Sequence, residues 1–69
     1  MIIFVRLIDE GTTVFRPVDA RRISDDVFEI IDQSNEDNEI WEFAFMDRVR
    51  CADHIFQDGS RGLVATSHA

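Results

Sequence analysis

The chain has 69 residues, of which 45% are hydrophobic and 30% charged, and its formal net charge at pH 7 is −7. This length allows one domain, residues 1–69, which buries about 60% of the surface that its unfolded chain exposes. A deep small-molecule pocket would take up much of so small a core, so we expect no enzyme. Six phenylalanines and one tryptophan suffice for one core and exclude intrinsic disorder.

The apolar start of the chain, residues 2–8, indicates a strand rather than an export signal. It is too short to span a membrane, is interrupted by Arg6, and has neither a basic leader nor a small-residue cleavage site. The single Cys51 excludes an internal disulfide, and a free thiol fits a reducing compartment. We therefore expect a cytoplasmic protein that does not engage membranes.

The first half of the chain predicts three strands separated by polar turns. Residues 2–8 end at an acidic turn that closes with Gly11. Residues 12–20 are again rich in β-forming side chains, and Pro17, which lacks an N–H, places them on a sheet edge or at a bulge. Residues 27–31 predict a short third strand. The side chains of this strand that share one face are Phe28 and Ile30.

The second half of the chain predicts three further strands. Residues 40–46 alternate most clearly, with one aromatic face. That face holds Trp41, Phe43 and Phe45. Residues 48–52 place two apolar side chains inward and two arginines outward, and residues 62–66 form a last strand after the turn pair Asp58-Gly59. The inward residues of the fifth segment are Val49 and Cys51.

Six short segments joined by tight turns predict an all-β fold, a small antiparallel barrel or curled sheet of five to six short strands. An α+β fold is the alternative. Ser24 is a suitable N-cap for a helix over residues 25–33, and residues 39–56 contain neither Gly nor Pro and also fit helical spacing.

A signature spans residues 9–20, which read Asp-Glu-Gly-Thr-Thr-Val-Phe-Arg-Pro-Val-Asp-Ala. Together with residues 41–43, 49–51 and 62–65, it resembles a group of short bacterial proteins with no assigned function. The resemblance implies a small β-rich domain from a bacterium or its mobile elements, and it supplies no catalytic residues. After Phe43 the group has Pro and Gly in a turn, where this chain has Ala-Phe-Met-Asp. Residues 40–46 are therefore either extended or form that turn in another way.

Cys51 and His54 have the spacing of half a metal site, and they are also a conceivable nucleophile and base. A zinc site needs three or four ligands, and the second histidine, His68, lies one residue from the end. On a strand, positions 51 and 54 face opposite sides. We therefore expect a buried thiol and a surface histidine, with no metal and no cofactor, and rank a small metal protein or enzyme last.

The acidic residues form a segment. Residues 1–22 hold three acids against four arginines, residues 48–69 hold two against three, and residues 23–47 hold nine carboxylates and no base. Folded onto so small a body, this segment predicts a concentrated negative surface. The candidate partner-binding residues are Asp25, Asp26, Glu29, Asp32, Glu36, Asp37, Glu39 and Glu42.

A negative surface attracts basic proteins, repels nucleic acid, and can imitate its phosphates. The sequence thus predicts a small acidic protein-binding domain of the inhibitor or immunity type, like anti-CRISPR proteins by analogy of size and charge. Its partner would be a basic, nucleic-acid-handling protein. The alternative is a structural or assembly module that self-associates through an edge strand, with charge serving solubility only. The two hypotheses predict a monomer and a small homo-oligomer respectively.

Overall fold

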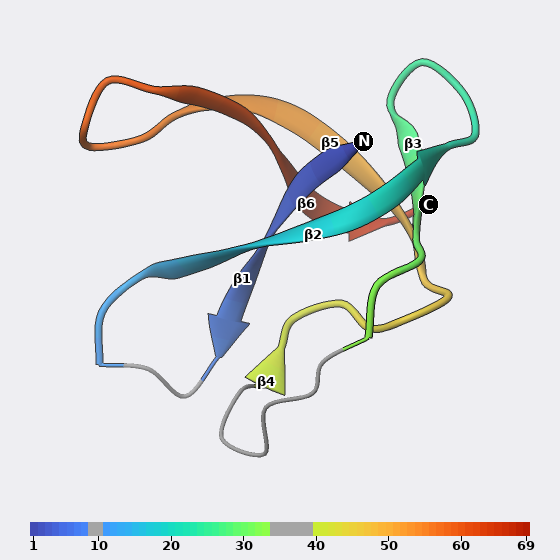
Figure 1. The fold of residues 1–69 in the computed structure, drawn as a ribbon, viewed down its shortest axis with the longest axis horizontal. Coiled ribbons are helices and arrows are strands. Elements are labelled where there is room, and N and C mark those ends of the chain that lie inside the picture. The colour runs from blue at the N-terminus through green and yellow to red at the C-terminus, as the bar shows by residue number, and fades with distance from the viewer. Residues whose placement is uncertain (9–10, 34–39) are drawn as a thin grey trace.

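The computed structural model describes residues 1–8, 11–33 and 40–69, and within them the chain forms six strands and no helix (Figure 1). The all-β prediction is confirmed, and the helices considered in residues 25–33 and 39–56 do not form in the described part of those segments. None of the described residues belongs to a helix that would reach across a membrane. The strands are β1 (Ile2–Ile8), β2 (Val14–Arg22), β3 (Val27–Ile30), β4 (Ile40–Trp41), β5 (Arg48–Ile55) and β6 (Arg61–His68).

The strands form one sheet in the order β2-β3-β5-β6-β1-β4, and β2 also pairs with β1. This extra pairing closes the sheet into a ring, although the ring is not an even barrel (Figure 1). The sheet is mixed rather than wholly antiparallel, because β1 and β6 run parallel and meet through the pair Phe4 and Val64. A parallel neighbour is possible here because β6 reaches β1 only after four intervening strands.

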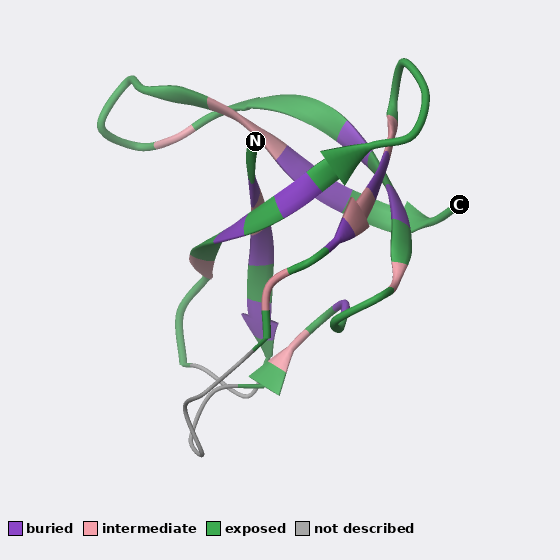
Figure 2. Cartoon of the chain, turned by 45° about the vertical axis from the view of Figure 1, so that its right-hand side comes forward, coloured by how far each residue is buried: buried purple, intermediate pink, exposed green. Residues whose placement is uncertain are grey.

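The core lies inside the ring, where the strands turn their buried residues toward one another (Figure 2). In β1 the residues alternate between exposed or half-buried and buried, as period two requires for a strand with one face inward. The predicted inward pairs of β3 and β5 are confirmed. The largest fully buried side chains, in order of size, are Phe28, Ile3, Ile30, Val5, Val18 and Val49.

Pro17 lies on an open edge of the sheet, as predicted. Met1 and Ala20 exchange two backbone hydrogen bonds, and such pairs alternate along an antiparallel ladder. Phe4 and Pro17 are three steps further on and form a pair without hydrogen bonds, so the proline nitrogen points away from β1. No ladder bond is therefore lost.

The prediction of a strand over residues 40–46 is wrong beyond Trp41. Only Ile40–Trp41 pairs with β1, and the chain then forms a turn in which the Asp47 N–H donates to the Ala44 carbonyl at 3.0 Å. The third residue of this turn, Met46, has a φ of 75°, in the left-handed region that favours glycine. The turn expected from Pro and Gly thus forms without either. Phe43 is buried, while Phe45 points to solvent.

The remaining differences concern strand ends. β5 runs to Ile55 rather than residue 52, with an irregularity between Arg50 and Cys51, and β6 covers Arg61–His68 rather than 62–66. β2 begins and ends two residues later than predicted. The turn at Asp58-Gly59 is confirmed, since Gly59 has a φ of 88° and the Phe56 N–H donates to the Ser60 carbonyl.

Candidate functional site

Five of the eight predicted partner-binding carboxylates lie in the described part of the structure, and Glu36, Asp37 and Glu39 lie outside the described residues. The five do not form one continuous surface of free charge. Three of them lie just before β3 or on it, among arginines from neighbouring strands. These three are Asp25, Asp26 and Glu29.

Glu29 lies between two arginines. The antiparallel register places Arg21 of β2 and Arg48 of β5 directly beside it on its two sides. Its Oε1 is 2.7 Å from Arg21 Nη2, and its Oε2 is 3.7 Å from Arg48 Nε. The Glu29 side chain is only 13% exposed, because the two guanidinium groups cover it. The carboxylate is therefore neutralised by its own fold.

Asp26 pairs with Arg50, with 3.0 Å between Oδ2 and Nη1. Arg22 donates to the backbone carbonyls of Ser24 and Asp25, and its guanidinium lies 5.8 Å from the centre of the Phe28 ring. We call this group the arginine patch. It consists of Arg21, Arg22, Arg48, Arg50, Asp25, Asp26 and Glu29, with a formal charge of +1.

The excess negative charge of the chain therefore belongs to residues outside the arginine patch. Removing the arginine patch from the fourteen acids and seven arginines leaves eleven carboxylates against three arginines, a net charge of −8, and six of these carboxylates belong to the described residues. Sequence reasoning missed the pairing because the arginines lie outside residues 23–47. A sequence signal for the pairing did exist. Two arginines precede this segment and two follow it, and the pairing of β2 and β5 with β3 places these arginines beside β3.

Asp32 and Glu42 lie outside the arginine patch. Asp32 Oδ2 accepts a hydrogen bond from the Asp19 backbone N–H at 3.2 Å, so two carboxylates lie near each other on the edge of β2. The Asp19 carboxylate is 3.8 Å from the N-terminal ammonium group of Met1. Glu42 is exposed, and its N–H donates to the Arg6 carbonyl.

Asp47, which follows Glu42 in the acidic segment, is held by the turn. Its Oδ2 accepts from the Ala44 N–H at 2.8 Å and lies 3.2 Å from His68 Nε2. The hydrogen bond from Ala44 is the main cause that lowers the pKa of Asp47, and His68 adds to it. The Asp47 carboxylate therefore stabilises the turn that precedes β5.

The Cys51 thiol and His54 occupy opposite faces of β5, as expected for a strand. Cys51 is buried, and its burial, with a smaller contribution from the charge of Asp26, raises the pKa of the thiol to about 11. His54 is exposed and packs beside Phe15 and Phe56. Among the described residues no three groups of His, Cys, Asp or Glu are close enough together to hold a metal ion.

The structure also forms an aromatic cluster that the sequence did not predict. The sheet curls so that outward rings of β1 and β2 meet rings at the far end of the β5–β6 hairpin. Phe56 is central: its ring centre is 4.8 Å from Phe4, 5.4 Å from Phe15 and 4.9 Å from His54, in edge-to-face geometry. We call Phe4, Phe15, His54 and Phe56 the outer aromatic cluster. The three phenylalanines are half-buried, so part of each ring remains accessible.

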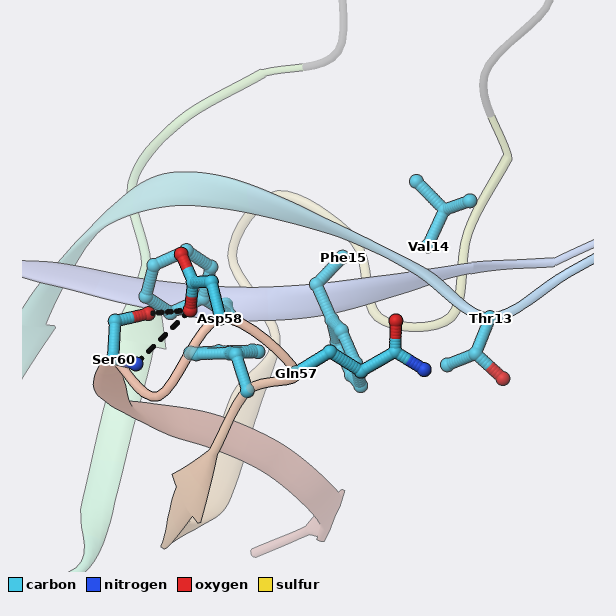
Figure 3. Close-up of a pocket in the computed structure, with 8 residues that line it drawn as sticks. Thr13, Val14, Phe15, Gln57, Asp58 and Ser60 are labelled. Atoms are coloured by element: carbon cyan, nitrogen blue, oxygen red, sulfur yellow. Dashed lines mark hydrogen bonds between the residues drawn. The ribbon is translucent and has the colours of Figure 1, made fainter.

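An open cleft of about 460 Å³ lies over this cluster, between the residues before β2 and the turn between β5 and β6 (Figure 3). Gln57 extends toward Phe15 and Thr13, while Asp58 is tied to Ser60. The cleft lies on the surface and takes no volume from the core. The sequence-based expectation concerned a deep pocket inside the core, so it does not cover this cleft. The signal in the sequence was Phe4, which lies on the face of residues 2–8 opposite the buried Ile3 and Val5.

Gly62 permits the approach of the two hairpins. A Cβ atom at this position would lie 2.6 Å from Phe4 Cε1 and 3.0 Å from Phe56 Cε2.

The chain matches no protein-family model, no curated protein and no solved structure. The distribution of charge and the outer aromatic cluster are therefore the two features from which a function is argued.

Proposed function

We propose that this chain is a small binding domain, of the inhibitor or immunity type, that docks on a basic protein partner. The observation that carries the proposal is the separation of charge. The chain has seven arginines and fourteen acidic residues, and four of these arginines belong to the arginine patch. The rest of the molecule has a net charge of −8, and a field of this sign attracts basic proteins.

The same separation revises the binding surface. Asp26 and Glu29 already contact guanidinium groups, so a partner gains little from them. Asp32 and Glu42 remain the strongest of the described candidates, and Asp19 joins them because its backbone contacts Asp32. A non-catalytic role is consistent with the buried thiol of Cys51, which burial keeps protonated and which lies on the opposite face from His54.

Self-association through an edge strand is the second candidate. It is supported by the open edge of β2 beside Pro17 and by exposed apolar side chains such as Ile55, which is 62% exposed. Proline on an edge, however, is a common device against pairing with another chain. Light scattering on the pure protein distinguishes the two: a stable dimer favours assembly, and a monomer favours docking.

The test is affinity capture from a bacterial lysate at about 50 mM salt with the natural chain and two variants. One variant combines Asp19→Asn, Asp32→Asn and Glu42→Gln, and the matched control combines Asp25→Asn, Asp26→Asn and Glu29→Gln. Each removes three negative charges, and the control removes them where arginines of the chain already neutralise them. We expect basic proteins to be captured by the natural chain and by the control, and much less by the first variant.

Nucleic acid added to the lysate provides a second readout, because a partner with a nucleic-acid groove would be competed away. Equal loss of capture with both variants would mean that the position of the charge is irrelevant. Capture that consists of acidic or neutral proteins would contradict the proposed function.

A further inference from the structure

The cleft over the outer aromatic cluster combines ring surfaces with a carboxylate. Phe4, Phe15 and Phe56 line it together with Asp58, Gln57 and Thr13. Aromatic rings carry negative potential on their faces and attract a cation placed over them. A carboxylate at the rim of the same cleft adds a second attraction for the same kind of group.

The Asp58 carboxylate lines the cleft and also accepts hydrogen bonds within its own turn. The Ser60 N–H and hydroxyl both donate to Oδ1, at 2.9 Å and 2.6 Å. Asp58 is exposed, so its carboxylate is accessible to a ligand. The hydrogen bonds from Ser60 lower the pKa of Asp58, so the group carries its negative charge at neutral pH.

The charged residues nearest in sequence do not line the cleft. Arg61 and Asp53 lie on β6 and β5 at positions whose side chains alternate with Gly62 and His54, so they face the opposite side of the hairpin. Arg6 lies opposite Phe15 on β1, but it is not among the residues that line the cleft. His54 packs beside Phe15 but does not line the cleft either; it lines a neighbouring hollow with Phe15 and Phe56.

We propose that this cleft receives an arginine side chain from the basic partner, with the guanidinium group against the Phe15 and Phe56 rings and paired with Asp58. This inference rests on the proposed function and adds a specific contact to it. Arginine fits better than lysine because its planar group can stack on a ring and pair with a carboxylate at once. A nucleic-acid base could also stack on these rings, but its phosphates would meet a molecule of charge −7.

The test is an NMR titration of the natural chain with a capped tetra-arginine peptide at about 50 mM salt. A tetra-citrulline peptide, which keeps the shape and lacks the charge, is the control ligand, and a four-nucleotide oligothymidine is the competing class. We expect tetra-arginine alone to shift the resonances of Phe15, Phe56 and Gly59.

Three variants locate the contact. Asp58→Asn removes the charge and keeps an oxygen for Ser60, while Phe15→Leu removes a ring. Asp53→Asn removes one charge from the same hairpin on the face away from the cleft. We expect the first two to weaken tetra-arginine binding roughly threefold to tenfold and the third by less than about twofold. Because Asp58→Asn leaves the packing intact, the test does not depend on the stability of Phe15→Leu.

The outcomes separate this inference from the proposed function. Shifts confined to the surroundings of Asp32 and Glu42, or equal effects of Asp58→Asn and Asp53→Asn, would overturn the cleft and leave docking by charge in place. If oligothymidine shifts the resonances of the same rings, the cleft binds nucleic-acid bases by stacking, and the proposed arginine site is overturned. No shift with any peptide would overturn the cleft and count against the proposed function as well.

Discussion

The fold alters the acidity of the Cys51 thiol. The chain has no tyrosine, and its seven arginines account for all of its Lys and Arg, so Cys51 is the only side chain that titrates between about pH 8 and 11. Burial raises the pKa of the thiol from 9.0 to about 11. The alkaline stability of the protein therefore reports on a single side chain.

We predict that the free energy of unfolding falls as the pH rises from about 9 to 11. The unfolded chain loses the thiol proton first, near pH 9, while the folded chain keeps it until about 11. Below pH 8 both forms hold the proton, and the thiol adds no pH dependence. The loss reaches roughly 2 kcal/mol at the upper end. Urea unfolding at several pH values measures this loss of stability. The control is Cys51→Ala, which should not show the loss; the N-terminal amine is present in both proteins, so its titration cancels in the comparison. An equal fall in both proteins would contradict the burial of the thiol.

Met46 has a backbone conformation that a side chain disfavours. Its φ of 75° costs a non-glycine residue about 1–2 kcal/mol, and its side chain is 62% exposed, so little packing compensates. We predict that Met46→Gly stabilises the protein by about 0.5–1 kcal/mol, after the entropy that glycine gains in the unfolded chain. Denaturant unfolding measures the change. Met46→Ala removes the side chain and keeps the strain, so a stability of Met46→Gly no higher than that of Met46→Ala would count against this turn.

At the scale of the elements, the packing of the β5–β6 hairpin on β1 depends on Gly62. We predict that Gly62→Ala destabilises the protein by about 1–3 kcal/mol, because the added methyl group displaces the Phe4 and Phe56 rings. Gly11→Ala is the matched control, since a Cβ atom there meets nothing within 4 Å, and it should change stability by less than about 0.5 kcal/mol. Thermal unfolding compares the two. Equal stability would mean that the hairpins do not pack as described.

The sequence predicted the strands well where short apolar segments are bounded by polar turns. Residues 2–8 and 27–31 are short and apolar, and the structure contains them as β1 and as β3, which ends one residue earlier, at Ile30. Residues 40–46 show the clearest alternation in the chain, yet most of them form a turn. Backbone hydrogen bonds of Met46 and Asp47 to Ile30 and Ala44 decide the conformation there, and these contacts depend on the position of β3. Alternation alone does not contain that information.

At the scale of the whole molecule, the sequence predicted the amount of negative charge but not its position. The arginine patch exists because β2 and β5 both pair with β3, and this could not be derived from a base-free segment considered alone. The outer aromatic cluster is a product of curling, since its rings come from β1, β2 and the far end of the β5–β6 hairpin. Neither feature is local in sequence.

Docking on a basic partner depends most on a negative surface outside the arginine patch. The direct measurement is the affinity for the captured partner between about 50 and 500 mM salt, for the natural chain and for the variant with Asp19→Asn, Asp32→Asn and Glu42→Gln. We predict a steep loss of affinity with salt for the natural chain and a shallower one for the variant. An affinity that does not change with salt, or that changes equally in both proteins, would contradict the account.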